Sequence, residues 1–337
     1  MRNTLAQRWP GIYIPPIPEK KLVGNNDEEF VEERRSLLER FMKECGKYEY
    51  VTHSKEFKLF AREKGDIEKM LSALGRLTPM QILEKYRLNF NIDEDQEGSP
   101  LSHYKENIID FQQFLRKAIP VMEIQKRQLK KMMTVRDEQD ASYQQIITSI
   151  FKYEDNNVEF YGEGDPNKRI LTNPDIHGDV KERADATFNG LRNPYREAYL
   201  MLKGELLDLK GMSDALAGRE NVVKMMSATE AKKRDNQQEL EKLSQGKTTL
   251  KSIFKSSKSK ENDILNLQAA IEVANKDIAD YKKLIHFLTI YHGQVAINKF
   301  KREKQRQYLR LMHNMSVKEI SNSHLQATFW NTILEVG

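Results

Sequence analysis

The distribution of proline constrains the fold of this 337-residue chain more than any other feature. Ten prolines occur at or before Pro194, and residues 195–337 contain none. Because proline breaks helix interiors, the first part of the chain is expected to form short elements, whereas the last part is free to form very long helices.

Apolar residues recur at helical spacing in three long segments, at about 101–154, 180–244 and 260–334. Pro120 should kink the first segment, and Gly190–Pro194 should loosen the second. Helices of this size are about 80–110 Å long at ~1.5 Å per residue, so each must bury its apolar stripe against neighbouring rods. No strict heptad is present, which disfavours a straight two-stranded coiled coil. The predicted fold is all-α, with three long helices that pack side by side and against a second copy.

Shorter helices are expected before residue 101, because caps and apolar stripes recur there. The piece at 64–77 is amphipathic, and Thr78–Pro79 restarts a helix because proline suits the first helical position. Acidic connectors are predicted at 91–100 and 155–179. The short helices are expected at 27–45, 54–62, 64–77 and from 79 to about 87.

Charge and composition limit the classes of partner. The formal net charge is +5 and the pI is about 8.9, which favours an acidic partner such as a lipid surface, a nucleic acid or another protein. The lone Cys45 excludes an intramolecular disulfide and indicates a reducing compartment. The sequence has no apolar signal core and no run of about 18 apolar residues, so membrane contact is expected to be peripheral.

Three basic clusters offer surfaces for such a partner. Taken singly, each is more simply a solvated helix face, but together they favour an anionic membrane, where each basic residue contributes about 1 kcal/mol. Nucleic acid is the competing partner, yet the segment 244–260 interleaves only Phe254 for base stacking. The clusters are Lys126, Arg127, Lys130 and Lys131; Lys247, Lys251, Lys255, Lys258 and Lys260; and Lys299, Arg302, Arg306 and Arg310.

A proline-rich loop, "RWPGIYIPPIPEKK" at 8–21, precedes the helix "FVEERRSLLERF" at 30–41. Polyproline geometry stiffens such a loop and can hold Lys20 and Lys21 in a defined place. Arg34 on the helix can supply the planar donor fork that phosphate prefers. The pair is a candidate phosphate pocket, and the alternative is an SH3-ligand-like turn beside a solvated helix.

The stretch "RNTLAQRWPGIYIPPIPEKK…FVEERRSLLERFM", with "SKEFKLFAR" after it, resembles the second half of a phox-homology (PX) domain from the sorting nexins. The remaining residues resemble a sorting-nexin BAR domain, which typically ends much as "INKFKREKQRQYLRLM…HLQATFW" does here. The resemblance covers nearly the whole chain. It implies a partial PX region at 1–62, a linker with an amphipathic helix at 63–100, and a BAR domain at 101–337. A BAR domain in turn implies a long three-helix antiparallel coiled-coil bundle that forms a curved dimer.

The resemblance also implies roles for particular residues. Lys20 matches the family's phosphoinositide-phosphate contact, and Arg34 matches the arginine that contacts inositol hydroxyls. Residues 12–14 match a loop that dips into the bilayer, namely Ile12, Tyr13 and Ile14. The family's three-stranded sheet and its Arg-Arg-Tyr or Arg-Arg-Phe motif have no counterpart in this sequence, so a helical half of a PX domain without its sheet is expected.

No motif supports catalysis or a cofactor. "GKT" at 246–248 lacks the first glycine of a phosphate loop, since Glu241 occupies that position. His286 and His292 are not spaced as a metal-ligand pair on a helix. The predicted function is a non-enzymatic, endosomal peripheral membrane protein that binds phosphoinositide or anionic lipid, pairs with itself or another BAR-domain sorting nexin, and senses or stabilises curvature. The alternative is a helical scaffold whose PX region no longer binds lipid.

Overall fold

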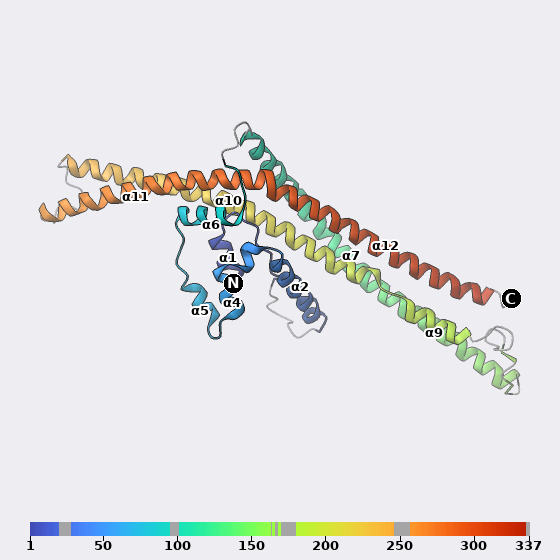
Figure 1. The fold of residues 1–337 in the computed structure, drawn as a ribbon. Helices are drawn as coiled ribbons and strands as arrows, with labels where there is room; N and C mark the ends of the chain where they lie inside the picture. The colour runs from blue at the N-terminus through green and yellow to red at the C-terminus, as the bar shows by residue number, and fades with distance from the viewer. Residues whose placement is uncertain are drawn as a thin grey trace. The chain divides into compact units, whose positions relative to one another are not determined.

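The computed structural model describes residues 1–19, 28–94, 101–162, 164–165, 168–169, 180–245 and 257–334. Within these residues the ordered elements are helices, and no β-strand occurs among them (Figure 1). This agrees with the all-α prediction. None of the described helices has the length and apolar run needed to cross a membrane.

Short helices occupy the first part of the chain, as the proline distribution predicts. Ser54, the first residue of the helix predicted at 54–62, caps α4, because its side chain accepts a hydrogen bond from the Phe57 amide. The restart at Thr78–Pro79 is also confirmed, since Thr78 and Gln81 form a reciprocal capping box. These helices are α1 (Arg2–Arg8), α2 (Glu28–Gly46), α3 (Glu49–Thr52), α4 (Lys55–Arg62), α5 (Ile67–Ser72) and α6 (Pro79–Asn89).

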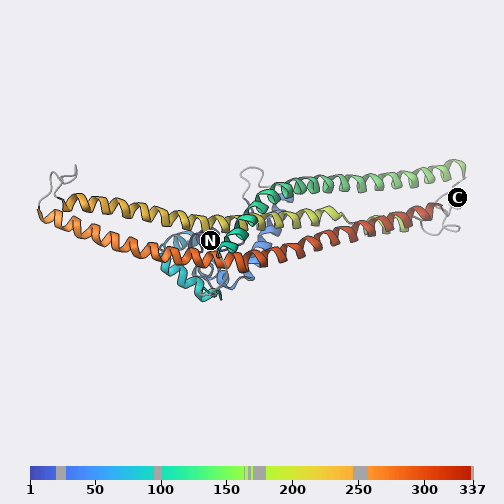
Figure 2. The ribbon, with the colours of Figure 1, turned by 90° about the horizontal axis from the view of Figure 1, so that it is seen from above.

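Long helices follow, and they correspond to the three predicted segments (Figures 1 and 2). The first continues through Pro120 and past its predicted end at 154, to Tyr161. The second is divided at Gly190–Pro194, where a break was expected. The third contains a π-helix in its middle, which was not predicted. The elements are α7 (Leu101–Tyr161), α9 (Val180–Gly190), α10 (Pro194–Ser244), α11 (Ser257–Ile290), η2 (Tyr291–Ala296) and α12 (Ile297–Leu334).

The chain divides into two compact units. The first comprises Met1–Ile119 and Leu207–Arg302, and the second comprises Pro120–Leu206 and Glu303–Gly337. Helices α7, α10 and α12 therefore contribute residues to both units. This division differs from the domain boundaries predicted at residues 62 and 100, which stay predictions.

The first unit has one hydrophobic core that joins the N-terminal segment to the long helices. Trp9 is 2% exposed; its ring stacks on Tyr86 of α6 at 5.7 Å between centroids and lies 5.4 Å from Tyr50. Val222 of α10 and Leu284 of α11 belong to the same core, as do Phe287 and Leu288. The N-terminal segment therefore packs against α10 and α11.

Close backbone contact at Gly218 of α10 completes this packing. A Cβ atom at Gly218 would lie 2.6 Å from the backbone nitrogen of Gly11. Gly11 itself has φ = +83°, a conformation that strongly favours glycine. Two glycines thus allow the loop before the prolines to lie directly against α10.

The second unit buries a smaller apolar core between three helices. Leu202 of α10 packs with Leu311 of α12, and Met122 and Leu129 of α7 lie against them. Further along, Ile147, Ala184 and Phe329 form a separate cluster. These contacts confirm that the long helices pack side by side.

The π-helix η2 lies where α11 meets α12. A Cβ atom at Gly293 would lie 2.5 Å from the Cβ of Tyr104, so the small residue lets α7 approach closely. The neighbouring His292 is buried, and burial lowers the pKa of its imidazole to about 4. His292 is therefore a neutral residue of the interior at physiological pH.

Candidate membrane-contact site

The predicted membrane-insertion loop is buried in the first unit. Ile12 and Ile14 are each 3% exposed and belong to the central core, and Tyr13 is also buried. The Tyr13 hydroxyl donates a hydrogen bond to Asp208 Oδ1 at 3.0 Å, and Tyr50 donates to the Tyr13 carbonyl. Membrane insertion of these three residues would require them to leave this core, and it stays a prediction.

Arg34 lies next to the proline loop, as the sequence predicted. Its guanidinium donates a hydrogen bond to the backbone carbonyl of Glu19, the residue that precedes Lys20. Lys20 lies outside the described residues, so its approach to Arg34 stays a prediction. The described contact brings α2 to the end of the loop that carries this lysine.

The basic face of α7 lies in the second unit. Arg127 and Lys131 are exposed, whereas Lys126 and Lys130 are half-buried. Lys126 pairs with Glu123 one turn earlier, and the Lys130 ammonium lies 5.5 Å from the ring centroid of Tyr199. Arg127 and Lys131 therefore present the positive charge of this face to solvent.

The basic face of α12 lies in the first part of the helix and is exposed. Lys299, Arg302, Arg306 and Arg310 are all solvent-exposed, and their spacing of three to four residues places them along one side of the helix. Lys299 and Arg302 fall in the first unit, and Arg306 and Arg310 fall in the second. The Lys299 ammonium also lies 5.4 Å from the ring centroid of Tyr48.

The third predicted cluster lies outside the residues whose side chains are described. Lys247, Lys251 and Lys255 belong to segment 246–256, and Lys258 and Lys260 fall at the start of α11. Their part in a membrane contact stays a prediction.

Sequence reasoning missed a buried ion pair in the first unit. Asp208 of α10 accepts hydrogen bonds from the Arg40 guanidinium of α2 through both of its carboxylate oxygens. The pKa of the adjoining Tyr13 is raised well above its usual value, mainly by burial and next by the negative charge of Asp208. The Tyr13 hydroxyl therefore stays protonated. The partners are separated by 168 and 195 residues, so no local spacing marks them.

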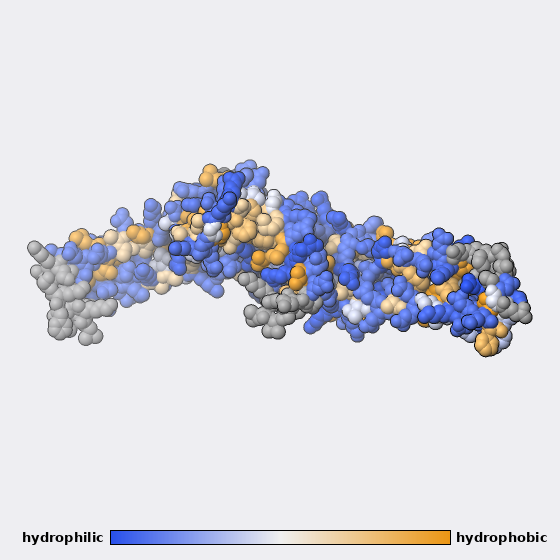
Figure 3. Space-filling view, turned by 90° about the horizontal axis from the view of Figure 1, so that it is seen from below, coloured by the Kyte–Doolittle hydropathy of each residue, from blue (hydrophilic) through white to orange (hydrophobic). Residues whose placement is uncertain are grey.

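Apolar side chains remain exposed on the second unit, on α7 and α12. Figure 3 shows apolar patches within a mainly hydrophilic face of the molecule. The exposed apolar residues of these two helices in this unit include Val121, Ile124, Val135, Ile146, Tyr153, Leu309, Val317 and Ile320. Large exposed apolar surfaces commonly mark protein interfaces.

Comparison with known proteins finds a domain family and several relatives that are similar to part of the chain. The PX domain family matches residues 1–64. Vacuolar protein sorting-associated protein vps5 of Schizosaccharomyces pombe is 43% identical over 56 residues, which cover 17% of this chain and 10% of that protein. Sorting nexin-4 of Bos taurus is 28% identical over 118 residues, covering 32% of this chain and 26% of the relative. These matches thus span a tenth to about a quarter of the relatives' length.

A solved structure matches the fold along almost the entire chain. The cryo-EM structure of the SNX-BAR Mvp1 tetramer aligns with 99% of this chain and 86% of its own, with a TM-score of 0.53 and 16% identity. The fold is therefore similar to that of an SNX-BAR protein. On these findings together the chain resembles sorting nexins that combine a PX domain with a BAR-type helical bundle.

Proposed function

We propose that this protein binds anionic, phosphoinositide-containing membrane as a peripheral protein and senses or stabilises curved membrane in endosomal trafficking. The observation that carries the proposal is the SNX-BAR fold along 99% of the chain, joined to a PX match at residues 1–64. In this role the protein has no catalytic step and needs no cofactor.

The exposed basic faces of α7 and α12 supply the proposed attraction to lipid. Arg127 and Lys131 face solvent on α7, and Arg302 and Arg306 do so on α12. Each basic residue near an anionic leaflet contributes about 1 kcal/mol, and a dimer doubles the number of such residues. Lys20 and Arg34 are the proposed contacts to an individual phosphoinositide headgroup.

A second BAR-domain chain is the proposed partner of the bundle. The apolar residues left exposed on α7 and α12 in the second unit support such pairing, since burying them removes apolar surface from water. The partner is either a second copy of this chain or another BAR-domain sorting nexin. Endosomal membranes are the proposed location, in line with the vacuolar-sorting and sorting-nexin relatives.

Charge reversal on the two described basic faces tests this proposal. Arg127→Glu with Lys131→Glu, and separately Arg302→Glu with Arg306→Glu, are each expected to weaken flotation with anionic liposomes at least about tenfold, because two attractive charges become repulsive. A matched control is Lys152→Glu with Lys181→Glu. These are exposed lysines of α7 and α9 with acidic neighbours in the sequence, and reversing them changes the net charge by the same amount. The control is expected to keep parental binding. An equal loss in all three variants would refute a specific role for the basic faces.

A scaffold function is the second candidate, favoured by one observation. The PX segment shares its core with α10 and α11, as Ile12 and Ile14 pack in the same cluster as Val222 and Leu288. A segment built into the rod in this way can act as a structural part of a larger assembly without binding lipid. A scaffold would ignore anionic liposomes at physiological salt, whereas the membrane protein binds them.

A further inference from the structure

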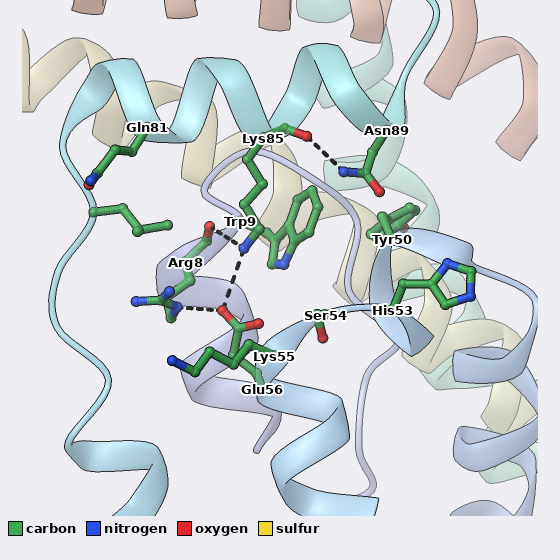
Figure 4. Close-up of a pocket in the computed structure, with 11 residues that line it drawn as sticks. Arg8, Trp9, Tyr50, His53, Ser54, Lys55, Glu56, Gln81, Lys85 and Asn89 are labelled. Atoms are coloured by element: carbon green, nitrogen blue, oxygen red, sulfur yellow. Dashed lines mark hydrogen bonds and ion pairs between the residues drawn. The ribbon is translucent and has the colours of Figure 1, made fainter.

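A cleft opens in the first unit between the end of α1, the start of α4 and helix α6 (Figure 4). Its volume is about 310 Å³, within the range that small-molecule sites occupy. Trp9 and Tyr50 contribute aromatic surface to its wall, and Arg8, Lys55 and Lys85 contribute positive charge. None of these residues belongs to the basic faces of α7 and α12 or to the pair of Lys20 and Arg34.

The cleft is built around one buried carboxylate shared by two cations. Figure 4 shows Arg8 and Lys85 both reaching Glu56, whose side chain is fully buried. The Arg8 Nε atom donates to Glu56 Oε1, and the Lys85 ammonium lies 3.5 Å from the same oxygen. The Lys85 ammonium also lies 3.9 Å from the centroid of the Trp9 ring. These contacts fix both cations at the cleft wall.

Positive charge in the cleft exceeds negative charge. Glu56 balances only one of Arg8 and Lys85, and the exposed Lys55 adds a further positive charge at the rim. His53 also lines the cleft but points away from the ion cluster in Figure 4. The start of α4, at Lys55 and Glu56, adds the positive end of a helix dipole. An anion with about two negative charges would neutralise this arrangement.

The Lys85 ammonium is largely removed from water in the cleft wall, and this lowers its pKa. Burial has the largest effect and lowers the pKa of Lys85. The negative charge of Glu56 raises this pKa, and the positive charge of Arg8 lowers it. The resulting pKa is about 8. An anion beside Lys85 would raise this pKa and so favour the charged ammonium.

We propose that this cleft binds the phosphoryl group of a small phosphate ester, with Arg8, Lys55 and Lys85 as its cationic contacts. A phosphate monoester carries about −1.5 to −2 charge at pH 7, which matches the excess, whereas a carboxylate carries only one. The cleft is larger than a phosphate group, so the organic part of the ester lies against the aromatic wall. The ester is either a soluble metabolite or the headgroup of a lipid, since both present the same chemistry.

Trp9 provides a site-specific signal for the test. The chain has two tryptophans, so Trp330→Phe leaves Trp9 as the sole one. In this background, titration with glycerol 3-phosphate is expected to give a saturable change in Trp9 emission, and glycerol alone should give none. Lys85→Met is expected to weaken binding at least tenfold, and Lys85→Arg should bind within about threefold of the parent because it keeps the charge. Lys58→Met, on an exposed part of α4 outside the cleft, serves as the matched control and should bind like the parent.

Two results would overturn the proposal: no saturable change at millimolar glycerol 3-phosphate, or equal affinity in Lys85→Met. If Lys85→Met loses helicity by circular dichroism, Lys55→Met takes its place, because Lys55 is exposed and its loss leaves the Glu56 ion pairs intact. Phosphatidylcholine vesicles containing phosphatidic acid identify the source: displacement of glycerol 3-phosphate indicates a lipid headgroup, and no displacement indicates a soluble ester.

Discussion

Replacing Asp208 with alanine is expected to lower the free energy of unfolding by about 3–5 kcal/mol. The side chain of Asp208 is 4% exposed and holds the Arg40 guanidinium of α2 through both oxygens. Its removal leaves a largely buried guanidinium without this counter-charge, and the buried Tyr13 hydroxyl loses its acceptor. Urea unfolding followed by circular dichroism at 222 nm measures the loss.

Asp214→Ala is the matched control for this prediction. Asp214 lies on the same helix and also pairs with an arginine of the N-terminal segment, with Arg2 Nη2 at 2.8 Å from Asp214 Oδ2. Its side chain is 65% exposed, so water and salt screen the pair, and the expected loss is at most about 1 kcal/mol. Equal losses for Asp208→Ala and Asp214→Ala would contradict the view that a buried ion pair holds α2 to α10.

Trp9→Ala is expected to cost about 3–5 kcal/mol of stability. The Trp9 ring packs between Tyr50 and Tyr86 and meets the edge of Phe90, in the core that joins the N-terminal segment to α10 and α11. Truncation would leave a large cavity there and expose the Lys85 stem. The same urea experiment reports the change, and Trp9→Phe should recover much of the lost stability because it refills part of the space.

The second tryptophan, Trp330, is a control for the loss of any tryptophan, whether buried or exposed. Trp330 of α12 is 38% exposed, so Trp330→Ala is expected to lower stability by about 1 kcal/mol or less. A loss for Trp9→Ala that is no greater than this would show that the N-terminal segment is not packed into the rod.

Local signals in the sequence predicted much of the helical architecture. Caps at Ser54 and Thr78 placed the starts of α4 and α6, and the absence of proline after Pro194 allowed the long helices. Local signals were less reliable at 64–77, where α5 covers only Ile67–Ser72. The π-helix was also missed; within it Gly293 closely approaches Tyr104, and these residues are far apart in sequence.

The functional residues depended on contacts that no spacing rule reveals. A proline-rich loop with Ile12 and Ile14 matches a membrane-inserting segment equally well whether it faces lipid or packs on a helix. In the structure Ile12 and Ile14 share a core with Val222 and Leu288, a contact that the sequence spacing does not predict. The cleft at Glu56 likewise gathers residues from three separate helices, so its charge excess appears only when the chain is folded.

Sedimentation with liposomes tests the central claim most directly. The full chain would be mixed with phosphatidylcholine vesicles of increasing anionic lipid content, at low and at high salt. We expect binding that rises with anionic content and falls with salt, because the Debye length shrinks from about 10 Å at 0.1 M to about 3 Å at 1 M. A folded, helical protein that stays in the supernatant with strongly anionic vesicles at low salt would contradict the membrane function. The scaffold function would then be the remaining candidate.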